Sequence, residues 1–427
     1  MCLTLPAKVI SASDFYAEVL INGKAQKIKI GTSDKISAGD YVLYTGDYLI
    51  KKIDEIEAKE IFELLSSYKK VDLDDLDEKY KDIILNSKKR ALTHAEIEYL
   101  IKLDNNMNTS HVCEVLESLY SEANIVRKES IKDHICIHGI IEFSNNCQND
   151  CLYCGLRKSN SSVNRYRMEP QEIIGTAVDA VNVRGYKILV LQSGEDLWYD
   201  DEKLLEIVKG IKAKARVFLY LSIGDRSFET YKKLKEAGAN GVLYRFETSN
   251  ADLYAKFHPG KILQDRIDSL KMMKKIGYLI STGMIIGLPG QTTSDLANDI
   301  MLMKELDTFM PSMGPLIPSG GTPLENEDSV DFELIRRVIA VSRLVMPKSR
   351  ISVTTAMETV GGTESRQKCF MAGANSVMFN LTPENYRKDY YIYANKFFDR
   401  ERKYEKWALF KGELSYNMLE EELKIKI

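Results

Sequence analysis

The chain has 427 residues and a formal net charge of −3, so its bulk charge gives no sign of nucleic-acid binding. This length suggests one large domain and a smaller one. The seven cysteines are an odd number, and no basic region leads into an apolar stretch near Met1, so we expect a cytoplasmic protein without a disulfide framework. The longest uncharged stretch, Ile276 to Ser294, contains glycines, Pro289 and polar side chains. It predicts a buried strand and its loop rather than a membrane span.

Residues 1–70 alternate apolar and polar side chains in short runs, namely AKVIS, YAEVLI, AQKIKI and DYVLYTGDYLIKKI. Turn residues such as Asn22-Gly23 and Gly39-Asp40 separate them, which is typical of a small β-barrel or sandwich. A helix-like tail, DEIEAKEIFELLSSY, follows. We assign 1–70 to this domain.

Residues 71–138 are charged and helical in period, and we interpret them as a helical lead-in to the next domain. Thr93 is followed by Glu96 three positions later, a pattern that predicts a capped helix start. The acidic run VDLDDLDEKY indicates a solvated face or linker.

From residue 139 to 395, strand-like and helix-like segments alternate regularly. Eight strand-like segments are expected, at 138–145, 187–194, 216–224, 240–248, 279–290, 309–318, 350–358 and 375–380. A helix-like segment follows each of the first seven, and YRKDYYIY follows the last. The pattern predicts an α/β fold of the (β/α)8 TIM-barrel type, with residues 396–427 as a C-terminal extension.

Cys147, Cys151 and Cys154 form a C-x3-C-x2-C triad directly after the first of these strands. Three thiolates in a tight loop can hold a 4Fe-4S cluster and leave one iron without a protein ligand, free to take a cofactor. A structural zinc knuckle and buried thiols are the alternatives. Zinc normally requires four ligands, and no fourth Cys or His lies near enough to complete an obvious knuckle.

The carboxyl ends of barrel strands meet at one face, where the chemistry of this fold is found. Small and polar residues stand at those ends: Gln192, Ser193, Gly194, Glu195, Ser222, Arg245, Glu247, Gly287 to Gln291, Thr354, Thr355 and Asn380. We expect them to line one mouth of the barrel.

The triad, with Tyr153 before its third cysteine, resembles the signature of radical S-adenosylmethionine (SAM) enzymes. A closer resemblance, over about residues 90–395, is to the HydE family of FeFe-hydrogenase maturases. It is carried by the stretches IEFSNNCQNDCLYCGLRKSN, RYRMEPQEI, VLQSGED, FETSN, GLPGQT, TPLENE, TTAMET and NLTPENYR. The resemblance implies one 4Fe-4S cluster, bound SAM and a role in assembling the diiron subcluster of the hydrogenase. The implied substrate is a small iron complex with cysteine, carbon monoxide and cyanide ligands.

The resemblance also implies the site residues. SAM contacts fall on Ser222, Glu247 and Arg266, with backbone contacts from Tyr153 and from the turn that contains Gly287. A carboxylate suits the cationic part of the cofactor, and a guanidinium suits its carboxylate. The residues expected to face the substrate are Gln192, Ser193, Thr354, Thr355, Tyr386 and Arg387.

The amino-terminal region resembles the HypC family of hydrogenase chaperones, on MCLTLPAKV and GDYVLYTGDYLIKKIDEIEA. The resemblance implies that Cys2, exposed by removal of Met1, binds iron or contacts a partner. A terminal thiol beside an amine is a ready chelator. Thr45 stands where that family carries a His.

Cys113, Cys136 and Cys369 lie on helix-like or apolar segments, and we interpret them as core thiols. Residues 395–427 contain no Cys, so no second cluster is expected there. Expected partners are other hydrogenase maturation factors and an electron donor, with neither nucleic acid nor membrane. Two alternatives stay open: a mutase like methylornithine synthase, and a non-catalytic scaffold that holds iron complexes.

Overall fold

The structure is a computed structural model that describes residues 5–21, 24–32, 34–45, 48–55, 58, 78–102, 109–131, 135–362 and 365–393. The chain divides into two compact units. One comprises Met1–Asp75 with Ile131–Asp133, and the other Leu76–Ser130 with His134–Ile427. Cys2, the Asn22-Gly23 turn, most of the helix-like tail after residue 55 and the extension at 396–427 lie outside the described residues. The side chain of Thr45 also lies outside them.

The first unit is a small closed barrel. Its five strands are β1 (Leu5–Ala12), β2 (Tyr16–Ile21), β3 (Lys24–Ile30), β4 (Tyr41–Thr45) and β5 (Tyr48–Ile53). They are ordered β1-β2-β3-β5-β4, and β4 pairs back with β1. Alternate residues, among them Val9, Val19, Val42 and Leu49, fill its core because side chains along a strand point to opposite faces. The predicted small β-barrel is confirmed.

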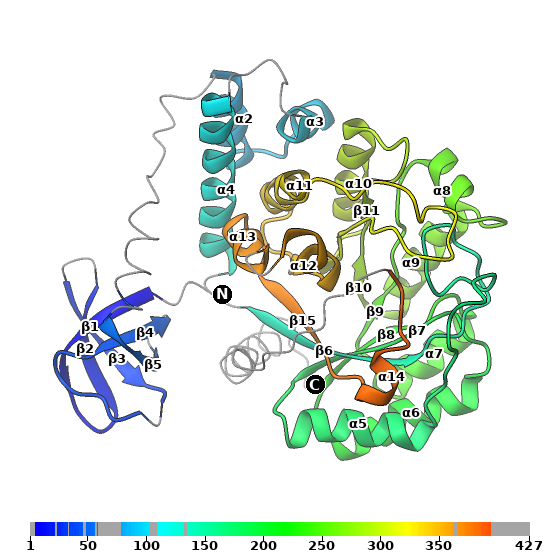
Figure 1. The fold of residues 1–427 in the computed structure, drawn as a ribbon, viewed down its shortest axis with the longest axis horizontal. Coiled ribbons are helices and arrows are strands. Elements are labelled where there is room, and N and C mark those ends of the chain that lie inside the picture. Colours follow the sequence, from blue (N-terminus) through cyan, green and yellow to red (C-terminus); the bar gives the residue numbers. More distant parts are fainter. Residues whose placement is uncertain are drawn as a thin grey trace. The chain divides into compact units, whose positions relative to one another are not determined.

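The second unit is built on eight parallel strands that nearly close into a barrel (Figure 1). The strands, in the order β12-β10-β9-β8-β7-β6-β15-β14, are β12 (Met310–Pro311), β10 (Leu279–Thr282), β9 (Gly241–Leu243), β8 (Phe218–Ser222), β7 (Ile188–Ser193), β6 (Cys136–Ser144), β15 (Ser376–Asn380) and β14 (Ser352–Val353). At the open seam the Arg350 amide, just before β14, donates to the carbonyl of Phe309, just before β12, at 2.9 Å. The predicted barrel is confirmed.

Helices surround this barrel (Figure 1). They are α5 (Pro170–Asn182), α6 (Asp201–Lys214), α7 (Phe228–Glu236), α8 (Ala251–Phe257), α9 (Leu263–Ile276), α10 (Thr293–Glu305), α11 (Phe332–Val345), α12 (Thr355–Gly361), α13 (Ser365–Met371) and α14 (Glu384–Arg387). Each strand end is therefore followed by a loop that leads into a helix, which leaves those loops free to form a site.

The predicted helical lead-in contains α2 (Glu78–Ser87), α3 (His94–Lys102) and α4 (Thr109–Ile131), which belong to the second unit except for Ile131. The predicted start of α3 is confirmed, since Glu96 accepts from the Thr93 amide at 2.8 Å and its own amide donates to the Thr93 hydroxyl. α3 packs on α10 and α11. The boundaries at 70, 138 and 395 stay predictions.

Four of the predicted strands are clearly shorter than expected. The segment 240–248 is a strand only over β9, and beyond it Glu247 adopts a left-handed backbone (φ 67°) that a regular strand cannot contain. The segment 350–358 is a strand only over β14, because α12 begins at Thr355. The segments 279–290 and 309–318 each break in two. Their second parts, β11 (Ile285–Ile286) and β13 (Gly314–Pro315), form a separate two-stranded sheet.

The interior of the barrel is packed at one level. Ile188, Val190, Phe218, Tyr220 and Met310 are fully buried there, alternating along their strands. Among the described residues no helix is long and apolar enough to cross a membrane.

Candidate active site

The cysteine loop follows β6 directly, as the sequence predicted. Cys147, Cys151 and Cys154 are all partly buried free thiols. Burial raises the pKa of each, to about 12 for Cys151, and neighbouring cysteines raise the pKa values of Cys151 and Cys154 further. A bound cation would favour the thiolate form of all three.

Among the described residues no three His, Cys, Asp or Glu side chains converge closely enough to share one metal ion. A cubane cluster asks for a different geometry, because each thiolate binds its own iron and the three sulfurs stay apart. The three thiols of this loop fit that group better than they fit a four-ligand zinc site.

The segment after β7 packs against the cysteine loop. The Glu195 amide donates to the Cys147 sulfur at 3.4 Å. A Cβ on Gly194 would lie 2.2 Å from the Asn146 carbonyl, so only glycine permits this close approach. The Glu195 carboxylate accepts from the Gln148 side chain at 2.6 Å and from the Asp225 amide at 2.8 Å. Amide donors to sulfur are a normal feature of thiolate-held clusters.

Tyr153 is held by a buried histidine. Nδ1 of His258 lies 2.9 Å from the Tyr254 carbonyl, which can only accept, so Nδ1 carries the proton. Nε2 then accepts from the Tyr153 hydroxyl at 2.8 Å. Burial lowers the pKa of His258 to about 4, which keeps the ring neutral. Tyr153 is thereby fixed between two of the three cysteines.

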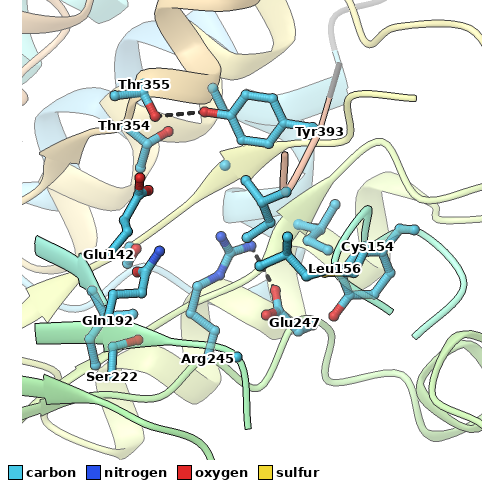
Figure 2. Close-up of a pocket in the computed structure, with 18 of the residues that line it drawn as sticks. Glu142, Cys154, Leu156, Gln192, Ser222, Arg245, Glu247, Thr354, Thr355 and Tyr393 are labelled. Atoms are coloured by element: carbon cyan, nitrogen blue, oxygen red, sulfur yellow. Dashed lines mark hydrogen bonds and ion pairs between the residues drawn. The ribbon is translucent and has the colours of Figure 1, made fainter. Parts of the chain in front are cut away.

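A cavity of about 310 Å³ lies against this loop (Figure 2). Ten of the residues proposed from the sequence line it: Cys147, Tyr153, Cys154, Gln192, Ser193, Ser222, Glu247, Arg266, Thr354 and Thr355. They come from loops and strand ends all round the barrel, which is the geometry that the fold predicts.

Charged groups are concentrated near the cysteines. Arg245 Nη2 lies 2.7 Å from Glu247 Oε2. Arg266 Nε donates to the Tyr254 hydroxyl at 3.0 Å, and its guanidinium lies 4.0 Å from the centre of the Tyr244 ring. These contacts use one edge and one face of the Arg266 fork, so its remaining donors can hold an anionic ligand group.

The other end of the cavity carries neutral hydroxyls, amides and one carboxylate. The Thr355 and Tyr393 hydroxyls lie 2.6 Å apart, and Asn380 donates to Glu142 at 2.8 Å. The Thr354 hydroxyl is buried and has no hydrogen-bond partner among the described residues. A buried polar group of this kind indicates a missing ligand contact.

Arg245 connects the two ends, and the sequence did not single it out beyond its place at a strand end. A Cβ on Gly314 would lie 3.3 Å from Arg245 Nη1 and 3.7 Å from the Thr354 hydroxyl. Without that Cβ, the guanidinium and the hydroxyl share one open space. Figure 2 shows Arg245 between Glu247 on one side and Thr354 on the other.

Four proposed residues are not brought into the cavity. Tyr386 and Arg387, which we predicted to face it, bond elsewhere. The Tyr386 hydroxyl donates to Glu172, and the Arg387 side chain donates to the Thr382 carbonyl. Gly287 lies outside the lining, and its amide donates to Gln291 at 2.7 Å. Cys151 is also outside the lining, beside Tyr153. Roles for all four stay predictions.

Asp299 on α10 ties together the two loops at the cofactor end, and nothing in the sequence pointed to it. Its carboxylate accepts from the Ser249 amide and hydroxyl at 2.5 and 2.6 Å. It also accepts from Gln291 at 3.3 Å, and Gln291 in turn holds the Gly287 amide. Burial raises the pKa of Asp299 to about 7.

Comparison with known proteins decides the family. The chain is 44% identical over 282 residues to the FeFe hydrogenase maturase subunit HydE of Thermotoga maritima, covering 66% of this chain and 80% of that protein. The chain belongs to the HydE family. Within this HydE-family chain, residues 141–303 match the Radical SAM superfamily, and residues 1–65 match the HupF/HypC family. Residues 312–400 match the biotin and thiamin synthesis associated domain, which the sequence analysis had not noted.

The mutase considered from the sequence is also related. The chain is 32% identical over 268 residues to 3-methylornithine synthase of Methanosarcina acetivorans, covering 62% of this chain and 74% of that protein. A crystal structure of methylornithine synthase superposes with a TM-score of 0.67 at 26% identity, covering 78% of this chain and 95% of that one. The barrel is therefore of the radical SAM type.

This HydE-family chain is a radical SAM enzyme, and its superfamily implies a 4Fe-4S cluster and SAM. The residues present fit both groups, since three thiols stand in one loop and charged side chains line the adjoining space. When bound, these groups supply one-electron cleavage of SAM to methionine and a 5′-deoxyadenosyl radical.

Proposed function

We propose that this chain acts in assembly of the diiron subcluster of FeFe-hydrogenase, by adenosyl-radical chemistry on a small iron complex with cysteine, carbon monoxide and cyanide ligands. The observation that carries the proposal is the combination of a HydE-like barrel with a HypC-like domain on one polypeptide. Both halves resemble hydrogenase assembly factors, and each supports the interpretation of the other.

In this proposal, different residues of the site bind the cluster, SAM and the substrate. Cys147, Cys151 and Cys154 would hold one cluster, and Ser222, Glu247 and Arg266 would hold SAM, with backbone contacts from Tyr153. Gln192, Ser193, Thr354 and Thr355 would face the iron complex, together with Arg245. Hydroxyls and a guanidinium suit an anionic complex, because each can donate hydrogen bonds to it.

The shape of the cavity also suits radical chemistry. One continuous space runs from Cys147 and Cys154 to Thr354 and Thr355, and Arg245 lines it. A reactive group formed beside the cysteines would therefore have a direct path to a substrate bound at the threonines.

Methylornithine synthase chemistry is the second candidate, favoured by the 32% identity and the superposition described above. The HypC-like domain argues against it, because a hydrogenase chaperone has no evident use beside an enzyme that makes an amino acid.

One experiment separates the two. The anaerobically reconstituted protein is added to a FeFe-hydrogenase maturation mix that lacks its own HydE, and in parallel to lysine with SAM and reductant. Hydrogen evolution selects the maturase, whereas methylornithine selects the mutase. A Cys154→Ala variant serves as the negative control in both arms.

We further propose that the HypC-like domain handles iron through Cys2, a residue outside the described part of the chain. The thiolate is the soft ligand for iron, and Thr45 cannot supply the nitrogen of a His. Cys2→Ala should reduce hydrogenase maturation and leave SAM cleavage intact, with Cys369→Ala as a thiol control. Intact mass showing Met1 retained, or full maturation by Cys2→Ala, would favour a docking role instead.

A further inference from the structure

A second hollow lies on the outer side of the cysteine loop. It encloses about 430 Å³ between residues 146–148 and residues 195–198, and Cys147 lines both this groove and the inner cavity. The groove is therefore a short route from solvent to the cluster site. We propose that it docks a small acidic protein that delivers the electron needed for SAM cleavage. This inference rests on the radical SAM function proposed above.

The rim of the groove presents positive charge to solvent. Lys158, Arg165 and Arg167 line it, and Lys158 and Arg167 are exposed. The two carboxylates of the groove, Glu195 and Asp196, are each only 4% exposed. Glu195 accepts from the Asp225 amide and Asp196 pairs with Arg167, so Lys158 and Arg165 give the groove its excess positive charge. An approaching partner therefore meets cations, which steer an acidic protein and suppress basic ones.

An apolar platform stands beside these charges. Leu197 is 58% exposed and Trp198 is 36% exposed, and both line the groove. Tyr199 packs edge-on against Trp198 with ring centres 4.8 Å apart, and the Lys203 ammonium lies 4.9 Å from the Trp198 ring. An exposed tryptophan that is held by neighbouring side chains and surrounded by basic residues is typical of the centre of a protein interface. Electron-transfer contacts are small, and a platform of this size suits them.

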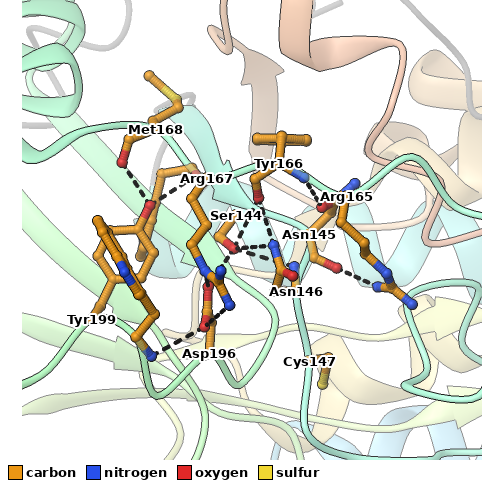
Figure 3. A network of polar contacts seen from close by, with 12 residues as sticks. Ser144, Asn145, Asn146, Cys147, Arg165, Tyr166, Arg167, Met168, Asp196 and Tyr199 are labelled. Carbon is orange, nitrogen blue, oxygen red and sulfur yellow. Dashed lines mark hydrogen bonds and ion pairs between the residues drawn. The ribbon is translucent and has the colours of Figure 1, made fainter.

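Hydrogen bonds hold the residues of both walls of the groove, as Figure 3 shows. Asn146 donates to the Tyr166 carbonyl at 2.8 Å, and the adjoining Asn145 donates to the Asn164 and Asp389 carbonyls at 2.8 and 2.7 Å. On the other wall, Asp196 accepts from Arg167 at 2.7 Å and from Ser144 at 2.7 Å. Cys147 is thus presented at a surface that needs no rearrangement on docking.

The protein that fits this groove is a one-electron carrier with a flavin or iron–sulfur centre near an acidic surface. In each encounter the carrier is oxidised by one electron and the cluster is reduced by one, with no atom transferred. That electron then breaks one carbon–sulfur bond of SAM, which balances the reaction proposed above.

The test uses the full chain and an acidic flavodoxin as probe. Binding of oxidised flavodoxin to cluster-free protein is measured by calorimetry at low and at high ionic strength. Reduction of the cluster-loaded protein is then followed optically, once with flavodoxin hydroquinone and once with dithionite. The variants are Lys158→Glu and Trp198→Ala, and the matched control is Lys275→Glu, an exposed lysine on α9 outside the groove.

We expect both variants to bind flavodoxin at least tenfold more weakly and to be reduced by it at least tenfold more slowly. Dithionite reduction, dithionite-driven SAM cleavage and melting temperature should match wild type, and wild-type binding should weaken with salt. Wild-type affinity in both variants, equal loss in Lys275→Glu, or no flavodoxin binding by wild type would each overturn the docking site. Failure of dithionite itself to drive SAM cleavage would instead overturn the proposed function.

Discussion

The two ends of the cavity hold their side chains by different means. Near the cysteines, charged groups are fixed by partners: Arg245 pairs with Glu247, and Arg266 bonds Tyr254. At the far end, hydroxyls and amides dominate, and the Thr354 hydroxyl has no partner among the described residues. The end near the cysteines suits a ligand with fixed charges, such as the SAM that radical SAM enzymes have in common. The far end suits a ligand that supplies the hydrogen bonds that the protein leaves open, and this end would determine which substrate is bound.

The largest effect is expected at the charged end. Arg266→Ala and Glu247→Gln should each weaken SAM binding about 10- to 100-fold, since a hydrogen bond to a charged group contributes roughly 1.5–3 kcal/mol. Iron content should stay at the wild-type value, because neither residue is a thiol ligand. Equilibrium dialysis with labelled SAM and iron analysis measure the two quantities.

Arg184→Ala is the matched control, because Arg184 also lies over a tyrosine ring, that of Tyr186, but outside the cavity. Unchanged SAM affinity in both cavity variants would contradict the assignment of this end to the cofactor.

A smaller effect is expected at the far end. Thr354→Val removes a buried hydroxyl that has no hydrogen-bond partner among the described residues. The substitution should therefore weaken only the binding of the substrate. Hydrogen evolution in the maturation mix should fall about tenfold, because that factor corresponds to the loss of one hydrogen bond to an anionic ligand. SAM affinity should stay the same.

Thr282→Val is its control, since the Thr282 hydroxyl is also buried without a described partner but lies outside the cavity lining. Equal activity of Thr354→Val and Thr282→Val would remove the distinction between the two ends.

A further effect concerns the stability of the fold and tests the role of Asp299 between the cofactor loops. Folding raises the pKa of Asp299 from its ordinary 3.8 to about 7, so the folded chain keeps a proton that the unfolded chain releases. The stability of wild type should therefore decrease, relative to Asp299→Asn, as pH rises from about 4 to 7, and then level off. Between pH 5 and 8 the difference should change on the order of 2 kcal/mol.

Asp295→Asn on the same helix gives the comparison. Burial alone would raise the pKa of Asp295, but the Thr292 amide and the Asn250 side chain lower it. The contribution of the Asp295 carboxylate to stability is then complete above pH 5. The difference in stability between Asp295→Asn and wild type should therefore not vary from pH 5 to 8. Melting temperatures of the cluster-free proteins measure both. A wild-type chain that shows no loss relative to Asp299→Asn would contradict the buried, protonated carboxyl.

The sequence predicted residues at both ends of the cavity and missed others, for physical reasons. The cysteine triad and the residues at strand ends carry a local signal, because each stands directly after an apolar run. Arg245 and Asp299 carry no such signal, since their roles depend on Gly314 and on loops distant in the chain. Glu142 had one weak signal, a lone carboxylate inside an otherwise apolar strand.

The positions of two other predicted residues have a similar cause. Tyr386 and Arg387 follow the last strand closely, but α14 turns them onto Glu172 and the Thr382 carbonyl. The break between β10 and β11 falls at Gly283, where a Cβ would lie 2.3 Å from the Ser312 carbonyl, and no pattern of apolar residues could reveal that close approach.

The most direct test of the account is SAM cleavage by the purified protein. After anaerobic reconstitution and reduction with dithionite, the wild-type chain should hold one 4Fe-4S cluster and form 5′-deoxyadenosine and methionine in equal amounts. Cys151→Ala should lose the cluster and the products together. A wild-type protein with a full cluster that forms no deoxyadenosine would contradict the account and favour a scaffold that only holds iron complexes.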